Sequence, residues 1–340
     1  MTTVNLSIRD FGDHACLFIP VQRGVRVLWE LTKRCNLACK HCFVPPYSKE
    51  RGDLSTAQCI SIMDSFPQAE VTRIIFSGGE PLTRRDIPEL IQASNARGIQ
   101  AALCTNATLV TDSIARDLYR SGLREAFVSL DGATAEVHDG QRGLSGSFDR
   151  TIKGIKTLKY NGLTVDISCI PTKLNIHDLQ ELPRLCSSLG CSSITFGGWF
   201  PKQNMRGTGG DLTPDAQSMT KFLHSFREVG EKANMPMHTS RLVPHAPLEA
   251  CPAGVSIIGI DASGHYHPCL NIPTTHSEIT DALKASITEI LKRFKKIPEL
   301  PTCAKNCPSG EECFGGCPAD KINGVDRVCS QKGLVSLQIR

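Results

Sequence analysis

Residues 25–42 read Val25-Arg-Val-Leu-Trp-Glu-Leu31-Thr-Lys-Arg-Cys35-Asn-Leu-Ala-Cys39-Lys-His-Cys42. The run Val25–Leu31 is mostly apolar and rich in β-branched and aromatic side chains, so it is predicted to form a buried strand. Three cysteines follow this strand, spaced four and three residues apart. Three thiolates at this spacing can close around one metal centre within a single loop, and they leave one position of that centre open.

Short apolar runs alternate with amphipathic stretches from this strand to about residue 200, which is the pattern of repeated βα units. The predicted strands are Val25–Leu31, Arg73–Ser77, Gln100–Cys104, Ala126–Leu130, Thr164–Ile170 and Ser193–Phe196. The predicted helices, placed by their polar starts, are Thr56–Phe66, Ser113–Ser121, Ser147–Tyr160, Leu179–Leu189 and Asp215–Lys232.

Parallel strands joined by right-handed helical crossovers curl into a barrel, and six such units are too few to close the eight-stranded form. The predicted fold class is therefore α/β, with a partial (β/α)6 TIM-like barrel followed by a small cysteine-rich metal-binding domain. The predicted boundaries are an N-terminal extension at 1–24, the barrel at 25–235 and the cysteine-rich domain at 236–340. Functional side chains are expected where the βα loops gather, at the C-terminal ends of the strands.

The composition narrows the class of protein further. The chain has 340 residues, 40% of them apolar, with a formal net charge of +4 and 16 cysteines. The nearly balanced charge argues against a nucleic-acid partner. Neither a signal peptide nor a stretch of about 20 apolar residues is found, so no membrane span is predicted. Clustered cysteines in a reducing compartment bind metal more often than they form disulfides, and the predicted location is the cytoplasm.

Polar residues also end the next three predicted strands. In Ser77-Gly78-Gly79-Glu80-Pro81 the glycines let the backbone approach a ligand closely, and Glu80 can accept a hydrogen bond from an ammonium group. Thr105-Asn106 ends the third strand and Ser129-Leu130-Asp131-Gly132 the fourth. The alternative for these residues is strand-end capping or surface ion pairing, which contributes little to stability.

The motif Cys35-x3-Cys39-x2-Cys42, placed after the first strand of a βα barrel, resembles the defining motif of the radical S-adenosylmethionine (SAM) superfamily. The resemblance implies that these cysteines hold a [4Fe–4S] cluster whose open iron binds SAM. It also implies an enzyme that reductively cleaves SAM to a 5′-deoxyadenosyl radical, which abstracts a substrate hydrogen. The alternative for this loop is a zinc site completed by His41.

By the same resemblance the residues at the strand ends bind SAM. The two glycines and Glu80 are similar to a motif that holds the methionyl amine, and the fourth strand's end is expected near the ribose. Arg142 matches an arginine that pairs with the SAM carboxylate. The expected SAM-binding residues are Gly78, Gly79, Glu80, Asn106, Ser129, Asp131 and Arg142.

A second group of cysteines occupies the C-terminal part of the chain, where regular periodicity fades. It reads Cys251-x12-Gly264-x4-Cys269, then Cys303-x3-Cys307-x5-Cys313-x3-Cys317, and finally Cys329. Seven cysteines exceed what one tetrahedral site uses, so two metal centres are predicted, and a segment this poor in periodicity is expected to depend on them to fold. A zinc-ribbon-like structural module is the alternative.

This pattern resembles the SPASM extension of radical SAM enzymes, which implies two auxiliary [4Fe–4S] clusters and three clusters in all. One departure is the gap of three residues between Cys303 and Cys307, where two are usual. The implied ligands of the outer cluster are Cys303, Cys307, Cys313 and Cys329, and those of the inner cluster are Cys251, Cys269 and Cys317. The inner cluster then has an open iron or a non-cysteine ligand, with His265 and His267 as candidates.

The resemblance favours a peptide or protein substrate. The leading hypothesis is oxidative modification of a ribosomally made peptide by cross-linking, epimerisation or side-chain oxidation. About 24 residues precede the first strand, which is too few for a leader-recognition domain, so the peptide is expected to bind the barrel or be recruited by a separate recognition protein. Leu270 follows Cys269 where sulfatase-maturing relatives tend to have aspartate, which counts against that subgroup. An electron donor such as flavodoxin or ferredoxin is expected.

Two other hypotheses remain. The first is a radical SAM enzyme that acts on a small metabolite, such as a sugar, a nucleoside or a tetrapyrrole intermediate. The second is a metal-stabilised binding protein without SAM chemistry.

Overall fold

One ten-stranded sheet organises the protein, of which the computed structural model describes residues 4–6, 24–42, 44, 52–197, 212–240, 254, 256–270, 280–294 and 337–339. The strand order is β11-β10-β9-β2-β3-β4-β5-β6-β7-β8, and neighbours from β9 through β8 run parallel. The strands are β2 Val25–Glu30, β3 Val71–Ser77, β4 Gln100–Thr105, β5 Glu125–Ser129, β6 Thr164–Cys169, β7 Ile194–Gly197, β8 Met237–Ser240, β9 Ile257–Ile260, β10 His265–His267 and β11 Thr280–Asp281.

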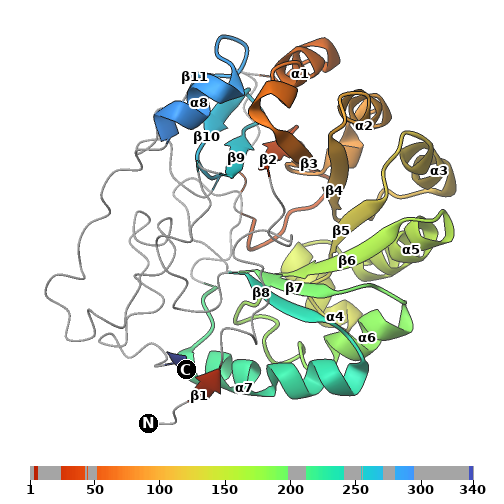
Figure 1. Ribbon diagram of the computed structural model, residues 1–340. Coiled ribbons are helices and arrows are strands. Elements are labelled where there is room, and N and C mark those ends of the chain that lie inside the picture. The colour runs from red at the N-terminus through yellow and green to blue at the C-terminus, as the bar shows by residue number, and fades with distance from the viewer. Residues whose placement is uncertain are drawn as a thin grey trace, which may run out of the picture.

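Helices connect successive parallel strands and lie along the outer face of the curved sheet (Figure 1). This arrangement is the predicted partial βα barrel, and the fold prediction is confirmed. The helices are α1 Thr56–Met63, α2 Ile87–Asn95, α3 Asp112–Arg120, α4 Ala135–Arg142, α5 Ser147–Tyr160, α6 Leu182–Ser188, α7 Ala216–Ala233 and α8 Ile287–Phe294. A separate parallel pair joins β1 Val4–Leu6 to β12 Leu337–Ile339.

The two faces of the barrel strands carry different side chains because successive residues of a strand point to opposite faces. Val27 and Trp29 of β2 lie in the main core, which also contains the buried faces of the helices. The alternate residue Leu28 packs with Ile75 of β3 and Phe127 of β5 in a smaller cluster that contains no helix residue. The smaller cluster therefore fills the concave side of the sheet.

Charged groups lie at the opposite end of the concave face from the loops that follow the strands. Buried Arg73 near the start of β3 is paired with Glu125 at the start of β5. Asp166 of β6 accepts a hydrogen bond from the Ser193 hydroxyl at 2.6 Å. The concave face is thus closed by polar pairs at one end and leaves the carboxyl ends of the strands for a site.

Local sequence explains where several helices begin. Ser55 caps α1 in a capping box, in which its hydroxyl accepts from the backbone N–H of Gln58 and the Gln58 side chain accepts from the backbone N–H of Ser55. Thr111 caps α3 by accepting from the N–H of Ile114. Asp112 is in the first turn, where a carboxylate is stabilised by the helix dipole.

Some helices and strands were not predicted from the sequence. Helices α2 and α4 are short, and α2 has proline in its first turn instead of a side-chain cap. Strand β8 extends the sheet beyond the six predicted strands, and β9 pairs with β2 on the other side. Because β8 through β11 belong to the same sheet as the barrel strands, the division at residue 236 stays a prediction.

No helix within the described ranges is both long and apolar enough to cross a membrane.

Candidate functional site

The cysteine loop follows β2 and is held from three directions. Asp53 accepts from the Thr32 hydroxyl at 2.7 Å, which anchors the start of the loop. The N–H of Lys40 donates to the Gln141 carbonyl of α4 at 2.9 Å. The third anchor is the turn after β3, which donates two hydrogen bonds to the loop. The loop carrying the three cysteines is therefore fixed by the ends of other barrel elements, at the carboxyl end of the sheet.

The Gly78–Gly79 turn lies directly against this loop. The N–H of Gly79 donates to the Thr32 carbonyl and the N–H of Glu80 donates to the Arg34 carbonyl, both at 2.7 Å. A Cβ atom on Gly79 would lie 2.1 Å from the Arg34 carbonyl oxygen, and Gly78 has φ +140°, which side chains rarely adopt. Glycine is required at both positions because the two backbones touch.

Glu80 is 1% exposed and is held by the end of β4. Its Oε1 accepts from the Thr105 hydroxyl at 2.8 Å and the Leu82 N–H at 3.0 Å, and its Oε2 accepts from the Asn106 N–H at 2.7 Å. Burial raises the pKa of this carboxyl, and these three donors oppose the rise. A carboxylate can accept about four hydrogen bonds, so one position is left for a further donor.

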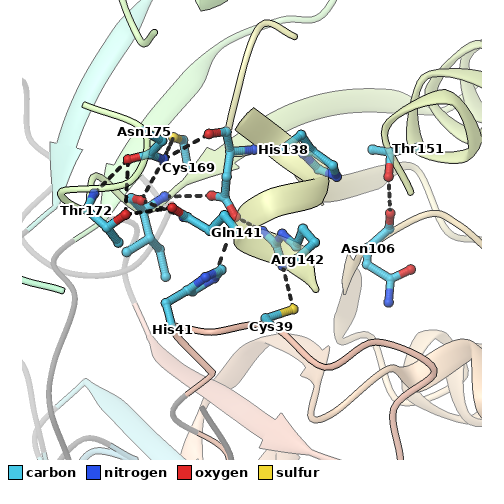
Figure 2. Close-up of polar contacts among 12 residues, drawn as sticks. Cys39, His41, Asn106, His138, Gln141, Arg142, Thr151, Cys169, Thr172 and Asn175 are labelled. Carbon is cyan, nitrogen blue, oxygen red and sulfur yellow. Dashed lines mark hydrogen bonds and ion pairs between the residues drawn. The ribbon is translucent and has the colours of Figure 1, made fainter. Parts of the chain in front are cut away.

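Asn106 joins the same loop from β4. Its Nδ2 donates to Asn36 Oδ1 at 3.0 Å and lies 4.0 Å from the Cys35 sulfur, and its Oδ1 accepts from the Thr108 N–H at 2.9 Å. Its backbone carbonyl accepts from the Thr151 hydroxyl at 3.0 Å (Figure 2). The predicted site residue Asn106 therefore contacts the cysteine loop itself.

Asp131 and Arg142 form a buried ion pair, and Figure 2 shows Arg142 beside Cys39. Arg142 Nη2 lies 2.6 Å from Asp131 Oδ2, and its Nη1 donates to the Cys39 sulfur at 3.8 Å. Asp131 is 0% exposed; burial alone would raise its pKa, but Arg142 and His41 hold the pKa below its ordinary value. Nε of Arg142 is buried and has no hydrogen-bond acceptor among the described residues.

A polar network in the loop after β6 fixes Asp131, and Figure 2 shows its buried members Gln141, Thr172 and Asn175. Asp131 Oδ1 accepts from the Ile170 N–H at 3.0 Å, and its backbone carbonyl accepts from Asn175 Nδ2 at 2.8 Å. The Thr172 hydroxyl donates to Gln141 Oε1 at 2.6 Å, which ties this loop to α4. These hydrogen bonds join Asp131, Gln141, Thr172 and Asn175, and buried networks of this kind favour one rigid arrangement.

Two histidines complete this region. His41 Nε2 lies 3.5 Å from Asp131 Oδ2, and His138 Nδ1 accepts from the Asp131 N–H at 3.2 Å. Burial lowers the pKa of each imidazole to about 4, so both rings are neutral at physiological pH. His41 Nδ1 and His138 Nε2 are buried without a hydrogen-bond partner among the described residues.

The three thiols differ in their surroundings. Cys39 is buried, whereas Cys35 and Cys42 are half-buried. The Cys35 sulfur accepts from the Leu37 N–H at 3.4 Å. Burial raises the pKa of the Cys35 thiol to about 11, so binding a metal there must release a proton. No three His, Cys, Asp or Glu side chains in the described ranges, Cys35, Cys39 and Cys42 included, are already arranged to share a single metal ion.

The β9–β10 hairpin carries the predicted auxiliary ligand Cys269, which is buried. The motif glycine, Gly264, has φ +83° in the hairpin turn. His265 Nδ1 and His267 Nε2 each lie 3.2 Å from Asp261, so both candidate ligands direct a ring nitrogen to this carboxylate. The other predicted auxiliary ligands lie outside the described residues: Cys251, Cys303, Cys307, Cys313, Cys317 and Cys329.

The chemistry of the residues around the cysteine loop fits binding of SAM and of an iron–sulfur cluster. Glu80 offers a free acceptor position to an ammonium group, and the unpaired Nε of Arg142 offers a donor to a carboxylate. The N–H donors toward the sulfurs of Cys35 and Cys39 suit thiolates that carry negative charge in a cluster. Ser129, at the end of β5, is half-buried and open to a further contact.

Comparison with known proteins identifies the family. Residues 29–186 match the model of the radical SAM superfamily. The mycofactocin maturase MftC of Mycobacterium tuberculosis is 30% identical over 322 residues, which cover 89% of this chain and 82% of the maturase. The chain therefore belongs to the radical SAM superfamily, in its SPASM-type branch, and is a radical SAM enzyme.

Another relative and a solved structure agree with this class. An AdoMet-dependent heme synthase of Oleidesulfovibrio alaskensis is 27% identical over 319 residues, which cover 86% of this chain and 82% of the synthase. The structure of Streptococcus suis SuiB bound to S-adenosylmethionine superposes with a TM-score of 0.73 at 18% identity, covering 88% of this chain and 74% of SuiB. At that identity the superposition shows the shared fold.

Sequence reasoning missed the residues that support the site from behind. Gln141, Thr172 and Asn175 are fully buried, yet none lies at a predicted strand end. The spacing Thr172-x2-Asn175 is a usable signal, because the Asn175 Oδ1 accepts from the Thr172 N–H at 2.7 Å in a local turn. His138 shares α4 with Arg142, and only the structure shows its contact with Asp131 in the loop after β5.

The buried neutral state of His138 predicts a pH dependence of stability. Its pKa is about 4 when folded against about 6.5 when unfolded, so on acidification the unfolded chain binds a proton that the folded protein does not. The free energy of unfolding should therefore fall by about 2 kcal/mol for this histidine between pH 7 and pH 5. His138→Gln should remove that share in urea unfolding of iron-free protein, whereas exposed His177→Gln should not. An unchanged pH slope in His138→Gln would contradict the assignment.

Proposed function

We propose that Cys35, Cys39 and Cys42 hold a [4Fe–4S] cluster and that the surrounding strand ends bind SAM. The observation that carries the proposal is the junction of the cysteine loop with the turn after β3, where Gly79 and Glu80 donate to Thr32 and Arg34. This junction supports the proposal because it joins the turn that carries Glu80 to the loop that carries the three cysteines. When bound, the reduced cluster and SAM together supply a 5′-deoxyadenosyl radical for hydrogen abstraction.

The proposed SAM contacts use side chains at the carboxyl ends of the strands and on α4. Glu80 would accept from the methionyl ammonium, with Gly78 and Gly79 allowing close approach, and Arg142 would donate from Nε to the carboxylate. Asn106 would orient the cysteine loop and contact SAM from β4. Ser129 would reach the ribose, and Asp131 would act on SAM through Arg142 because it is itself enclosed.

We propose two auxiliary [4Fe–4S] clusters in the C-terminal domain, 236–340. Cys251, Cys269 and Cys317 would bind the inner one and Cys303, Cys307, Cys313 and Cys329 the outer one. Support comes from β9, which pairs with β2 and so brings the hairpin before Cys269 next to the strand that leads into the first cysteine loop. Clusters in this position suit an oxidative reaction, because they can accept the electron that a substrate radical loses.

The substrate that we propose is a ribosomally made peptide, oxidised by a cross-link, an epimerisation or a side-chain oxidation. The name of the mycofactocin maturase relative and the solved complexes of SuiB with its precursor peptide SuiA, and of anSMEcpe with the Cp18Cys peptide, support a peptide. An electron donor such as flavodoxin or ferredoxin, and a separate peptide-recognition protein, complete the proposed partners. The proposed location is the cytoplasm, where thiols stay reduced.

A second candidate is a tetrapyrrole substrate, favoured by the names of the relatives. Heme synthases of three organisms are 26% to 28% identical to this chain, and an Fe-coproporphyrin III synthase is 34% identical over 47% of it.

One experiment separates the two substrates. Reconstituted enzyme with SAM and dithionite is given either iron-coproporphyrin III or the peptide encoded by a short reading frame beside its gene, and the products are followed by mass spectrometry. The peptide is expected to lose hydrogen or exchange it, with the porphyrin unchanged. Conversion of the porphyrin with an unchanged peptide would overturn the peptide proposal.

A further inference from the structure

The guanidinium of Arg142 bridges a carboxylate and a cluster ligand (Figure 2). Nη2 is paired with Asp131 at 2.6 Å and Nη1 donates to the Cys39 sulfur at 3.8 Å. Arg142 and Cys39 are each 8% exposed, and Asp131 is 0% exposed. Interactions between charges at such short range are screened little by solvent when they are buried.

The position of this guanidinium is set by Asp131 and not by the flexible arginine stem. Asp131 is held on both sides, because Oδ1 accepts from Ile170 and the backbone carbonyl accepts from Asn175. Arg142 itself is the last residue of α4, and the following Gly143 has φ +71° and leaves no room for a Cβ beside the Ala38 carbonyl of the cysteine loop. The donor thus reaches the sulfur from a rigid support.

The neighbouring sulfur has different donors. Cys35 receives the neutral N–H of Leu37 at 3.4 Å and the neutral amide of Asn106 at 4.0 Å. The bond to Cys39 comes from a cation, and charge-assisted hydrogen bonds are roughly twice as strong as neutral ones. Hydrogen bonds to the sulfurs and nearby charge are among the main determinants of an iron–sulfur reduction potential.

We propose that Arg142 raises the reduction potential of the cluster held by Cys35, Cys39 and Cys42, and that Asp131 is a positioning residue that fixes Arg142 and offsets part of its charge. This inference rests on the proposed cluster at these cysteines. Reduction adds negative charge to the cluster, so a cation bonded to the Cys39 thiolate favours the reduced state. The role is separate from SAM binding, which would use the unpaired Nε.

The test is a potentiometric titration of the reconstituted protein without SAM, read by electron paramagnetic resonance. The signal of this cluster is the one missing when Cys35, Cys39 and Cys42 are all alanine. Arg142→Met should lower the ratio of reduced to oxidised cluster about tenfold at a fixed potential, a shift of about 59 mV to more negative values. Asp131→Asn should shift the potential in the opposite direction, because it leaves the charge of Arg142 uncompensated.

The matched control is Glu125→Gln. It neutralises the carboxylate that is paired with buried Arg73 at the other end of the barrel, and it should not move the potential. Arg142→Lys keeps the positive charge but lacks the guanidinium group that reaches both Asp131 and Cys39, so it should give a smaller shift than Arg142→Met. It replaces Arg142→Met in the test if the methionine variant fails to fold. If the potential were unmoved in both Arg142→Met and Asp131→Asn, or shifted in the same direction in these two variants, this inference would be overturned while the proposed cluster site would stand. A wild-type signal that persists without the three cysteines would overturn the proposed cluster site and this inference with it.

Discussion

Gly79→Ala is expected to lower SAM cleavage by at least about 100-fold. The new Cβ would lie 2.1 Å from the Arg34 carbonyl oxygen, a distance that no rotamer relieves because both atoms belong to or adjoin the backbone. The cysteine loop must then move away from the turn after β3. It would break the bonds from Gly79 to Thr32 and from Glu80 to Arg34 that set the position of the cluster relative to SAM. A displacement of about 1 Å is enough to cost two orders of magnitude in rate.

Gly140→Ala is the matched control for this variant. Gly140 is exposed within α4, and a Cβ there would meet nothing within 4 Å. Alanine in a helix interior is favoured over glycine by roughly 0.5–1 kcal/mol, so the control should keep full SAM cleavage and unfold at a slightly higher temperature. Formation of 5′-deoxyadenosine at the wild-type rate by Gly79→Ala would contradict the close contact between the two loops.

Glu80→Gln is expected to weaken SAM binding by about 10- to 150-fold, the equivalent of about 1.5–3 kcal/mol for a lost charged hydrogen bond. The amide has no negative charge for an ammonium group, and its NH2 must face one of the donors Thr105, Asn106 or Leu82. Equilibrium binding of labelled SAM to anaerobic protein measures the change, with iron content measured in the same samples.

Glu89→Gln supplies the same chemical change on the exposed face of α2 and should bind SAM as tightly as the wild type. If Glu80→Gln instead retained iron and bound SAM with unchanged affinity, Glu80 would be a structural link between β3 and β4 and not a ligand of the amine.

The fold was predictable from sequence where periodicity was strong. The six strands from β2 to β7 lie within one or two residues of their predicted positions, and α5 matches its predicted span, Ser147–Tyr160. Strands β8 and β9 were not predicted, because four-residue segments such as Met237–Ser240 and Ile257–Ile260 carry no periodic signal of their own. They become strands by pairing with β7 and β2, which is a tertiary effect.

The candidate site was predictable where a residue follows a strand, since the carboxyl ends of parallel strands meet at one edge. That rule placed Glu80 and Asn106 together, and the structure joins them with a hydrogen bond of 2.7 Å. It did not indicate that Asp131 pairs with Arg142, because the partner lies on a short helix with few periodic positions. Sequence resemblance supplied Arg142, and the packing of α4 supplied its contact with Cys39.

Cys35, Cys39 and Cys42 are proposed to hold the cluster that cleaves SAM. The most direct measurement compares wild-type and Cys35→Ala/Cys39→Ala/Cys42→Ala protein, reconstituted anaerobically, for iron, sulfide and 5′-deoxyadenosine formed after adding dithionite. The variant is expected to lose about four irons, the content of one [4Fe–4S] cluster, and to form no 5′-deoxyadenosine. Zinc in place of iron in the wild type, or SAM cleavage that survives in the variant, would contradict the proposal.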